Sequence, residues 1–307
     1  MDHDVIDELS RRVDQLVGVW NIVPTPFHPD EELDLPSLRT LTDFVVGSGV
    51  DGMTILGVLG EGAKVSDQER STIIDVTLEQ AAGRVPVCVT VSAASGYRAA
   101  EFAREAQAKG GHSVMLSAPP LARPNDDAVR RHYLRVAEAV PDLPVVIQDL
   151  PTLGVWMTAE LIGRMAEEAP NLRVVKLEEE PTAPKVGRLM AANPQMRVLG
   201  GLGGEMLLEE LRRGAVGTMT GFGYPEILVQ IVRDYQAGDE EAALERFYRY
   251  MPLIRFENQQ LLNLPIRKRI YMRRGAIASD KLRAPGPVLD AQTVADLEDM
   301  LRRLELN

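Results

Sequence analysis

A lysine inside an apolar run is the residue of this sequence best suited to covalent chemistry. Lys176 follows Val174 and Val175 in the segment VVKLEE. Burial of an ammonium group removes its hydration and lowers its pKa, and the neutral amine is the form that attacks a carbonyl carbon to give a Schiff base. A lysine at the exposed end of a strand, paired with an acidic residue of the run 178–180, would explain the same pattern without catalysis. Both interpretations stay open at this point.

Two acidic residues near predicted strand ends can move a proton. Glu178 lies two residues after Lys176, so strand alternation places both side chains on one face. Asp149 follows Gln148 at the end of the segment PVVIQD. Either carboxyl group can serve as an acid or a base if burial raises its pKa, and an ion pair or a helix cap is the alternative role for each.

The sequence has few residues suited to metal binding, to a serine nucleophile or to nucleotide binding. The four histidines show no pairing at the spacing of metal ligands, and the sequence holds neither a GxSxG motif nor a Walker loop. We therefore predict no metal and no cofactor. The glycine-rich segments GGLGGE (200–205) and TGFG (220–223) are typical either of a phosphate cradle or of tight turns, and composition does not separate the two.

The elements that must position these residues alternate along the chain. Eight short β-branched runs are separated by segments of helical period, several of which begin at capping residues, namely Asp34, Ser66 and Thr158. Eight such units indicate the α/β class and a closed (β/α)8 TIM barrel with a C-terminal helical appendage. The predicted strands are 19–25, 52–57, 86–92, 113–118, 144–149, 173–178, 197–201 and 217–221.

The same pattern predicts three parts of the chain. Residues 1–17 form an N-terminal helical extension, residues 18–224 form the barrel, and residues 225–307 hold the last barrel helix and the helical appendage. A basic cluster lies on one of the C-terminal helices, where we expect a solvated face or a subunit contact, with an anion-binding site as the alternative. The cluster comprises Arg267, Lys268, Arg269, Arg273 and Arg274.

Composition limits the partners. The 307 residues include 45 Asp or Glu and 34 Lys or Arg, a formal net charge of −11, whereas nucleic-acid binders present basic faces. No apolar run is long enough to span a membrane, and the N-terminal segment lacks the layout of a signal peptide. Cys88 has no second cysteine to pair with and lies in the apolar run PVCVTV. We expect a cytoplasmic protein without nucleic-acid or membrane partners.

Six segments resemble, in order, the motifs of the dihydrodipicolinate synthase / N-acetylneuraminate lyase family. The resemblance covers about residues 18–300, and the order and spacing of the motifs are more specific than any one of them. The segments are GVWNIVPTPF (18–27), GVLGEGAKVSDQER (57–70), SAPPLARP (117–124), PVVIQDLP (144–151), VVKLE (174–178) and GAVG (214–217).

The resemblance implies roles for particular residues. Lys176 would condense with the keto group of pyruvate or another 2-oxo acid, and backbone N–H groups of the loop 57–61 would hold the substrate carboxylate. Amides at such a turn suit an anion, so an acidic protein can hold an acidic substrate. Because the family is commonly oligomeric, a homo-oligomer, a dimer or tetramer, is expected. The predicted substrate-binding residues are Thr25, Val58, Leu59, Gly60, Glu61 and Thr220.

The sequence departs from the family pattern at the proton relay. Gln148 stands where the family has its acid/base tyrosine, and Val58 and Leu59 replace two hydroxyl residues of the carboxylate loop. The segment PPLARP lacks the tyrosine that a neighbouring subunit lends. The arginine that recognises a second carboxylate falls near Leu153, which disfavours aspartate semialdehyde as a substrate. Glu178 and Asp149 are the candidates to replace the tyrosine.

These features together predict a class I, Schiff-base-forming lyase that acts on a 2-oxo acid as an aldolase or a dehydratase. Lys176 is its nucleophile, and Gln148, Glu178 and Asp149 complete the predicted catalytic set. Two alternatives stay open. One is a family member that binds a 2-oxo acid without turnover, and the other is a phosphosugar-binding barrel enzyme that uses the two glycine-rich turns.

Overall fold

The computed structural model describes residues 3–121, 125–151 and 154–306. Eight strands form a closed barrel in the order β1 to β8, and the paired strands run parallel. The predicted (β/α)8 TIM barrel with C-terminal helices is therefore confirmed.

Every predicted strand is present, and no strand begins more than one residue from its predicted range. The strand residues are almost all buried, as in a parallel sheet that is covered on both faces. Cys88, on β3, is one of these buried residues. The strands are β1 (Gly18–Ile22), β2 (Gly52–Ile55), β3 (Val87–Thr90), β4 (Ser113–Ser117), β5 (Val145–Asp149), β6 (Val174–Leu177), β7 (Arg197–Gly200) and β8 (Gly217–Thr220).

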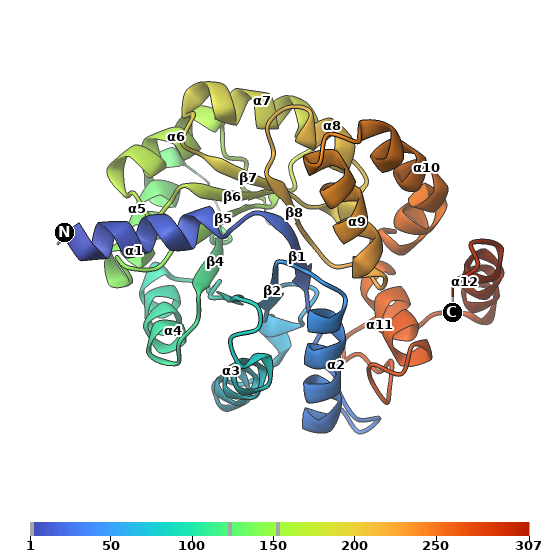
Figure 1. Cartoon of the computed structure of the whole chain (residues 1–307). Coiled ribbons are helices and arrows are strands. Elements are labelled where there is room, and N and C mark those ends of the chain that lie inside the picture. Colours follow the sequence, from blue (N-terminus) through green and yellow to red (C-terminus); the bar gives the residue numbers. More distant parts are fainter. Residues whose placement is uncertain (1–2, 122–124, 152–153, 307) are drawn as a thin grey trace. The chain divides into compact units, whose positions relative to one another are not determined.

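The chain divides into two compact units, and each holds part of the barrel wall. The first unit, residues 1–18, 86–201 and 209–219, contains β3 to β7 and most of β8. Within it, helices follow the strands in sequence and lie on their outer side (Figure 1). Its helices are α1 (His3–Asp14), α4 (Gly96–Ala108), α5 (Asp126–Ala139), α6 (Ala159–Glu168), α7 (Thr182–Ala192) and most of α8 (Leu207–Leu211).

The second unit, residues 19–85, 202–208 and 220–307, contains most of β1, all of β2 and the helices after β8. In this unit α2 and α3 pack side by side, and α10 packs along α9 (Figure 1). Its helical elements are α2 (Leu35–Gly47), η1 (Gly62–Lys64), α3 (Asp67–Ala81), η3 (Leu202–Gly204), α9 (Pro225–Gln236), α10 (Glu240–Glu257), α11 (Asn263–Arg273) and α12 (Ala291–Arg303).

The three predicted capping residues begin helices as expected. Asp34 accepts a hydrogen bond from Ser37 N, Ser66 forms a reciprocal capping box with Glu69, and Thr158 caps α6. These side chains satisfy amides that a helix leaves unpaired at its start. Local sequence therefore fixes where several helices begin, and with them where the preceding loops end.

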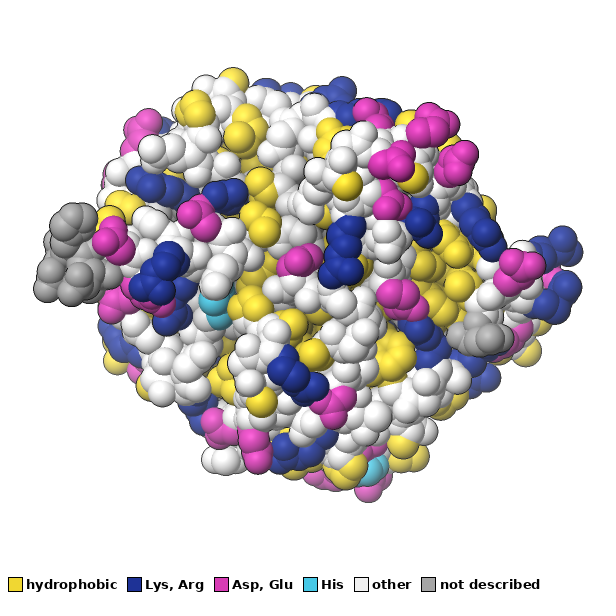
Figure 2. Space-filling view, in the orientation of Figure 1, with side chains coloured by type: hydrophobic (Ala, Val, Ile, Leu, Met, Phe, Trp, Pro, Cys, Tyr) yellow, Lys and Arg dark blue, Asp and Glu magenta, His cyan; other side chains and the backbone are white. Residues whose placement is uncertain are grey.

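Charged side chains of both signs are interspersed over the face shown in Figure 2. None of the helices in the described part of the chain combines the length and the apolar character that crossing a membrane requires. The same residues contain no group of three or more His, Cys, Asp or Glu side chains arranged to hold a metal ion. The division predicted at residues 17 and 224 stays a prediction, since the two compact units follow different boundaries.

Candidate active site

Lys176 is buried at the carboxyl end of β6. Only 5% of the residue is exposed, and in the sheet it pairs in register with Gln148 on β5 and Leu199 on β7. Residues paired in register share a face, so the side chains of Lys176 and Gln148 lie on the same side of the sheet. The amine is thus removed from bulk water at the end of the barrel where enzymes of this architecture place their chemistry.

Glu178 lies beside this amine. Its Oε2 is 3.1 Å from Lys176 Nζ and accepts a hydrogen bond from Gln148 Nε2 at 2.8 Å. The predicted alternation of residues 176 and 178 onto one face is therefore observed. The ion pair and a catalytic role for Glu178 are compatible, because a carboxylate at this distance can also remove a proton from the ammonium group and leave a nucleophilic amine.

The absence of a side chain at Gly201 leaves space for the side chain of Glu178. A side chain on Gly201 would overlap Glu178 Cγ and approach Leu177 O to 3.0 Å. The backbone holds Glu178 as well, because Glu178 N donates to Asp149 O at 3.0 Å and extends the β5–β6 ladder by one residue. Sequence reasoning missed the part played by Gly201, although the glycine run 200–204 was visible.

Asp149 lies on the opposite face of β5 and is ion-paired there. Its Oδ2 is 2.6 Å from Lys185 Nζ, and the residue is fully buried. Burial raises the pKa of Asp149 to about 6 despite this cation. Lys185 also donates to Glu179 Oε2 and to Met157 O, both at 2.6 Å. The structure therefore groups Gln148 and Glu178 with Lys176, and it pairs Asp149 with Lys185.

The predicted carboxylate loop, residues 57–61, is a tight turn after β2. Gly60 N donates to Gly57 O and Glu61 N donates to Val58 O, whereas the amides of Val58 and Leu59 donate to no group in the described part of the chain. A side chain at Gly60 would come within 2.9 Å of Leu56 N. Two adjacent unpaired amides in a glycine-dependent turn suit a carboxylate, and this function needs no hydroxyl at residues 58 and 59.

Two threonines of the predicted site hold backbone turns in the second unit. Thr25 Oγ1 donates to Gly60 O at 2.6 Å and so anchors the loop 57–61. Thr220 Oγ1 accepts a hydrogen bond from Gly203 N at 2.9 Å, within the turn that follows β7. One amide of that glycine-rich turn is thus already satisfied by the protein. The binding of substrate by either threonine stays a prediction.

The prediction of a solvated face for the basic cluster is wrong for two of its members. Arg267 and Lys268 are fully buried, and each is paired with a buried carboxylate at 2.6 Å, Glu257 for Arg267 and Glu61 for Lys268. Helical periodicity does not distinguish a charge in water from a charge buried with its counterion. Glu61 was placed in the site on sequence grounds, but its partner on α11 was missed. Leu153 lies outside the described residues.

Known proteins resemble this chain in sequence and in fold. The sequence model of the dihydrodipicolinate synthetase family matches residues 15–304. The chain is similar to L-2-keto-3-deoxyarabonate dehydratase of Azospirillum brasilense, at 34% identity over 94% of each chain. It is also similar to 4-hydroxy-tetrahydrodipicolinate synthase of Acidobacterium capsulatum, at 30% identity over 95% of this chain and 96% of that one. The crystal structure of dihydrodipicolinate synthase from Rhodopseudomonas palustris superposes with a TM-score of 0.89 at 33% identity, covering 94% of this chain and 98% of the other.

Proposed function

The chain belongs to the dihydrodipicolinate synthetase family, and from this we propose that it is a Schiff-base lyase that removes water from a 2-keto-3-deoxy sugar acid. One observation carries the proposal. It is the buried amine of Lys176 with the carboxylate of Glu178 at 3.1 Å. Similarity over almost the full length to a dehydratase of a keto-deoxy sugar acid supports this choice of substrate class over condensation with an aldehyde.

Lys176 would form the covalent intermediate. Glu178 takes a proton from the ammonium group, the free amine adds to the C2 carbonyl, and the resulting hydroxyl leaves as water with that proton. The product is a protonated Schiff base. Because the iminium withdraws electrons, a proton on C3 becomes acidic, and Glu178 removes it to give an enamine.

The enamine then drives the elimination. Its electron pair expels the hydroxyl group on C4, which departs as water with the proton returned by Glu178. One water molecule hydrolyses the Schiff base, releases the unsaturated 2-oxo acid and restores Lys176. The balance is the loss of one water from the substrate. A single carboxyl group beside the amine can therefore carry out every proton transfer for which the family uses a tyrosine.

Gln148 would orient this carboxyl group. Its amide does not exchange a proton at neutral pH, but it donates a hydrogen bond to Glu178 Oε2, the same oxygen that faces Lys176. This hydrogen bond fixes the rotamer of Glu178. We therefore assign Gln148 as a positioning residue and Glu178 as the acid and base.

The substrate carboxylate would be held by the backbone of the loop 57–61. The amides of Val58 and Leu59 are the groups available for it, and Thr25 anchors the turn through Gly60 O. Because Val58 and Leu59 have apolar side chains, the carboxylate would be held by N–H groups alone.

The test is a product assay with two substrate sets. Incubation with 2-keto-3-deoxy-L-arabonate should give a 2-oxo acid that is lighter by one water, detected by mass spectrometry. Pyruvate with an aldehyde should give no condensation product. Condensation without dehydration would contradict the proposal and favour an aldolase. Binding of the keto acid without any product would favour the alternative of a non-catalytic binder.

We also propose that the chain acts as a homo-oligomer in the cytoplasm. The family is commonly oligomeric, and α1 and the helices after β8 offer surfaces for association. Light scattering at micromolar protein concentration should give the mass of a dimer or a tetramer. A monomer at these concentrations would contradict the proposal.

A further inference from the structure

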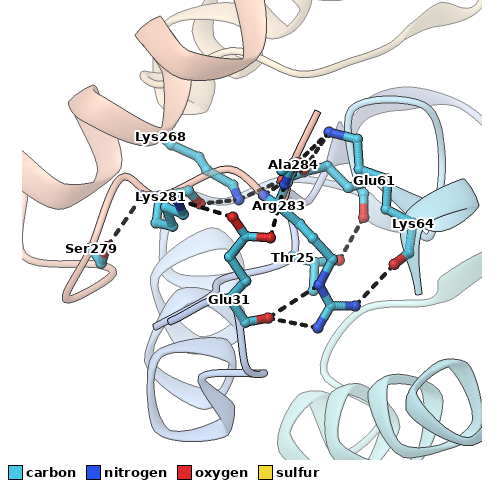
Figure 3. Close-up of polar contacts among 10 residues, drawn as sticks. Thr25, Glu31, Glu61, Lys64, Lys268, Ser279, Lys281, Arg283 and Ala284 are labelled. Atoms are coloured by element: carbon cyan, nitrogen blue, oxygen red, sulfur yellow. Dashed lines mark hydrogen bonds and ion pairs between the residues drawn. The ribbon is translucent and has the colours of Figure 1, made fainter. Parts of the chain in front are cut away.

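The last residue of the loop 57–61, Glu61, has a buried carboxylate. The side chain of Glu61 is 1% exposed, and its two oxygens accept three hydrogen bonds. Oε1 accepts from Lys268 Nζ at 2.6 Å, and Oε2 accepts from Lys64 Nζ at 2.9 Å and from Arg283 N at 3.1 Å. Figure 3 shows these groups converging on Glu61 from α11, from the segment after β2 and from the segment after α11. The loop is thus bound to parts of the chain more than 200 residues away.

The segment after α11, residues 278–284, is hydrogen-bonded to this cluster, and we call it the C-terminal strap. The guanidinium group of Arg283 donates to Glu31 O, to Lys64 O and to both carboxylate oxygens of Glu69 (Figure 3 draws the first two). Lys268 Nζ donates to Lys281 O at 2.8 Å. Both cationic groups also lie over the Phe27 ring, at 4.7 Å for Lys268 and 4.4 Å for Arg283.

This cluster acts on the part of the loop that carries the unpaired amides. Glu61 has a left-handed backbone conformation with φ of 53°, which is unfavourable for a residue other than glycine and needs an anchor. Glu61 N donates to Val58 O at 3.1 Å, and the next carbonyl back, Gly60 O, is held by Thr25. The orientation of the amides at residues 58 and 59 therefore depends on where the side chain of Glu61 is fixed.

We infer that Lys268 and Arg283 are positioning residues for the substrate carboxylate, because through Glu61 they hold the amides of Val58 and Leu59 in place. The inference rests on the proposed function, in which these amides receive the carboxylate of the 2-oxo acid. It gives the helical appendage a role in substrate affinity. Neither residue touches substrate in this account, so both should affect KM rather than the chemistry at Lys176.

A buried ion pair can also be merely structural, and the variants must separate the two roles. K268M leaves Glu61 buried with one cation fewer, so it should lose stability under either role and does not separate the two. The double variant E61Q/K268M removes one charge of each sign and so keeps the net charge of the wild-type cluster, and thermal stability should largely recover. Arg273→Gln is the control on the same helix, because Arg273 pairs with Glu298 and makes no contact with the loop among the described residues.

The measurement is the pyruvate concentration that gives half-maximal borohydride-trapped adduct on Lys176. We expect E61Q/K268M to raise it about tenfold, with the rate at saturating pyruvate within about threefold of wild type, since misplaced binding groups weaken binding. R273Q should leave both values unchanged. A double variant that regains stability and also keeps the wild-type half-saturation would overturn the inference.

Hydrogen exchange separates this inference from the proposed function. Peptides covering residues 56–62 should exchange faster in E61Q/K268M than in wild type or in R273Q. If the wild-type protein forms no adduct with pyruvate, the proposed function is wrong. The hydrogen-exchange rates of residues 56–62 then still test whether Glu61 and Lys268 anchor the loop. Unchanged exchange in the double variant would overturn the anchoring in either case.

Discussion

Two lysines are buried near β5 and β6, Lys176 on β6 and Lys185 on α7, and they have different polar partners. Lys185 Nζ lies 2.6 Å from each of three acceptors, Asp149 Oδ2, Glu179 Oε2 and Met157 O. Lys176 Nζ has one carboxylate partner among the described residues, Glu178, at 3.1 Å. An ammonium group has three donors; Lys185 donates to Met157 O and Glu179 Oε2 and forms an ion pair with Asp149, whereas Lys176 has a single close carboxylate among the described residues.

Strand alternation places the two lysine environments on opposite faces of β5. Gln148 pairs in register with Lys176, and the next residue on each strand, Asp149 and Leu177, faces the other side. One face of β5 therefore contributes to the proposed site, and the other contributes to the packing of α7. Three close acceptors suit Lys185 to a structural role, and a single close carboxylate suits Lys176 to the proposed chemistry.

Replacing the partner of the reactive lysine should have the largest effect. E178Q removes the acid and base but keeps the shape, so we expect the dehydration rate to fall about 10²- to 10⁴-fold. Because E178Q also leaves the buried Lys176 without its carboxylate partner, some stability should be lost, and the rate is compared on protein shown to be folded by circular dichroism. The control is Glu180→Gln, an exposed residue of the same segment, which should leave the rate unchanged. A rate for E178Q close to that of wild type would exclude Glu178 as the proton-transfer group.

Replacing Lys185, which pairs with Asp149 and Glu179, should lower the stability of the fold rather than the reactivity of Lys176. K185M leaves Asp149 and Glu179 without their shared cation, and the loss of one partner of a buried ion pair costs about 3–5 kcal/mol. Urea unfolding should show this loss in the free energy of unfolding. The folded fraction should still form a borohydride-trapped adduct on Lys176 at the wild-type rate. A lost adduct at unchanged stability would mean that the two lysines had been assigned in reverse.

The pH dependence of stability should show the smallest effect. Burial raises the pKa of Asp149 from 3.8 to about 6, so the folded chain binds this proton more tightly than the unfolded chain. That contribution is complete below about pH 4 and is lost as the pH rises through about 6. Relative to D149N, the wild-type free energy of unfolding should fall by up to about 3 kcal/mol between about pH 4 and pH 7. Parallel pH profiles of the two proteins would contradict this.

Much of the fold could be predicted because its signals are local. Each strand is a short β-branched run, and residues such as Ser66 and Thr158 mark helix starts by hydrogen bonds within one turn. The pairing of Lys176 with Glu178 was also predictable, because the two residues are separated by one position on a strand. Periodicity and alternation are enough for relationships of this kind.

The remaining features depend on contacts between distant residues. Lys268 and Glu61 are 207 positions apart, and nothing near either residue indicates the other. Lys185 has the pattern of an ordinary charge on an amphipathic helix, and only tertiary structure places it against Asp149. The sequence also left both Asp149 and Glu178 as candidates for the proton relay. In the structure Glu178 lies beside Lys176, whereas Asp149 pairs with Lys185.

The most direct test of the account is to locate the covalent adduct. Wild-type protein is incubated with pyruvate and borohydride, digested, and mapped by mass spectrometry, with K185M and K176A treated in parallel. We expect a reduced pyruvyl adduct on Lys176 in wild type and K185M and none in K176A. Folded wild-type protein without an adduct on Lys176, or with the adduct on Lys185, would contradict this expectation.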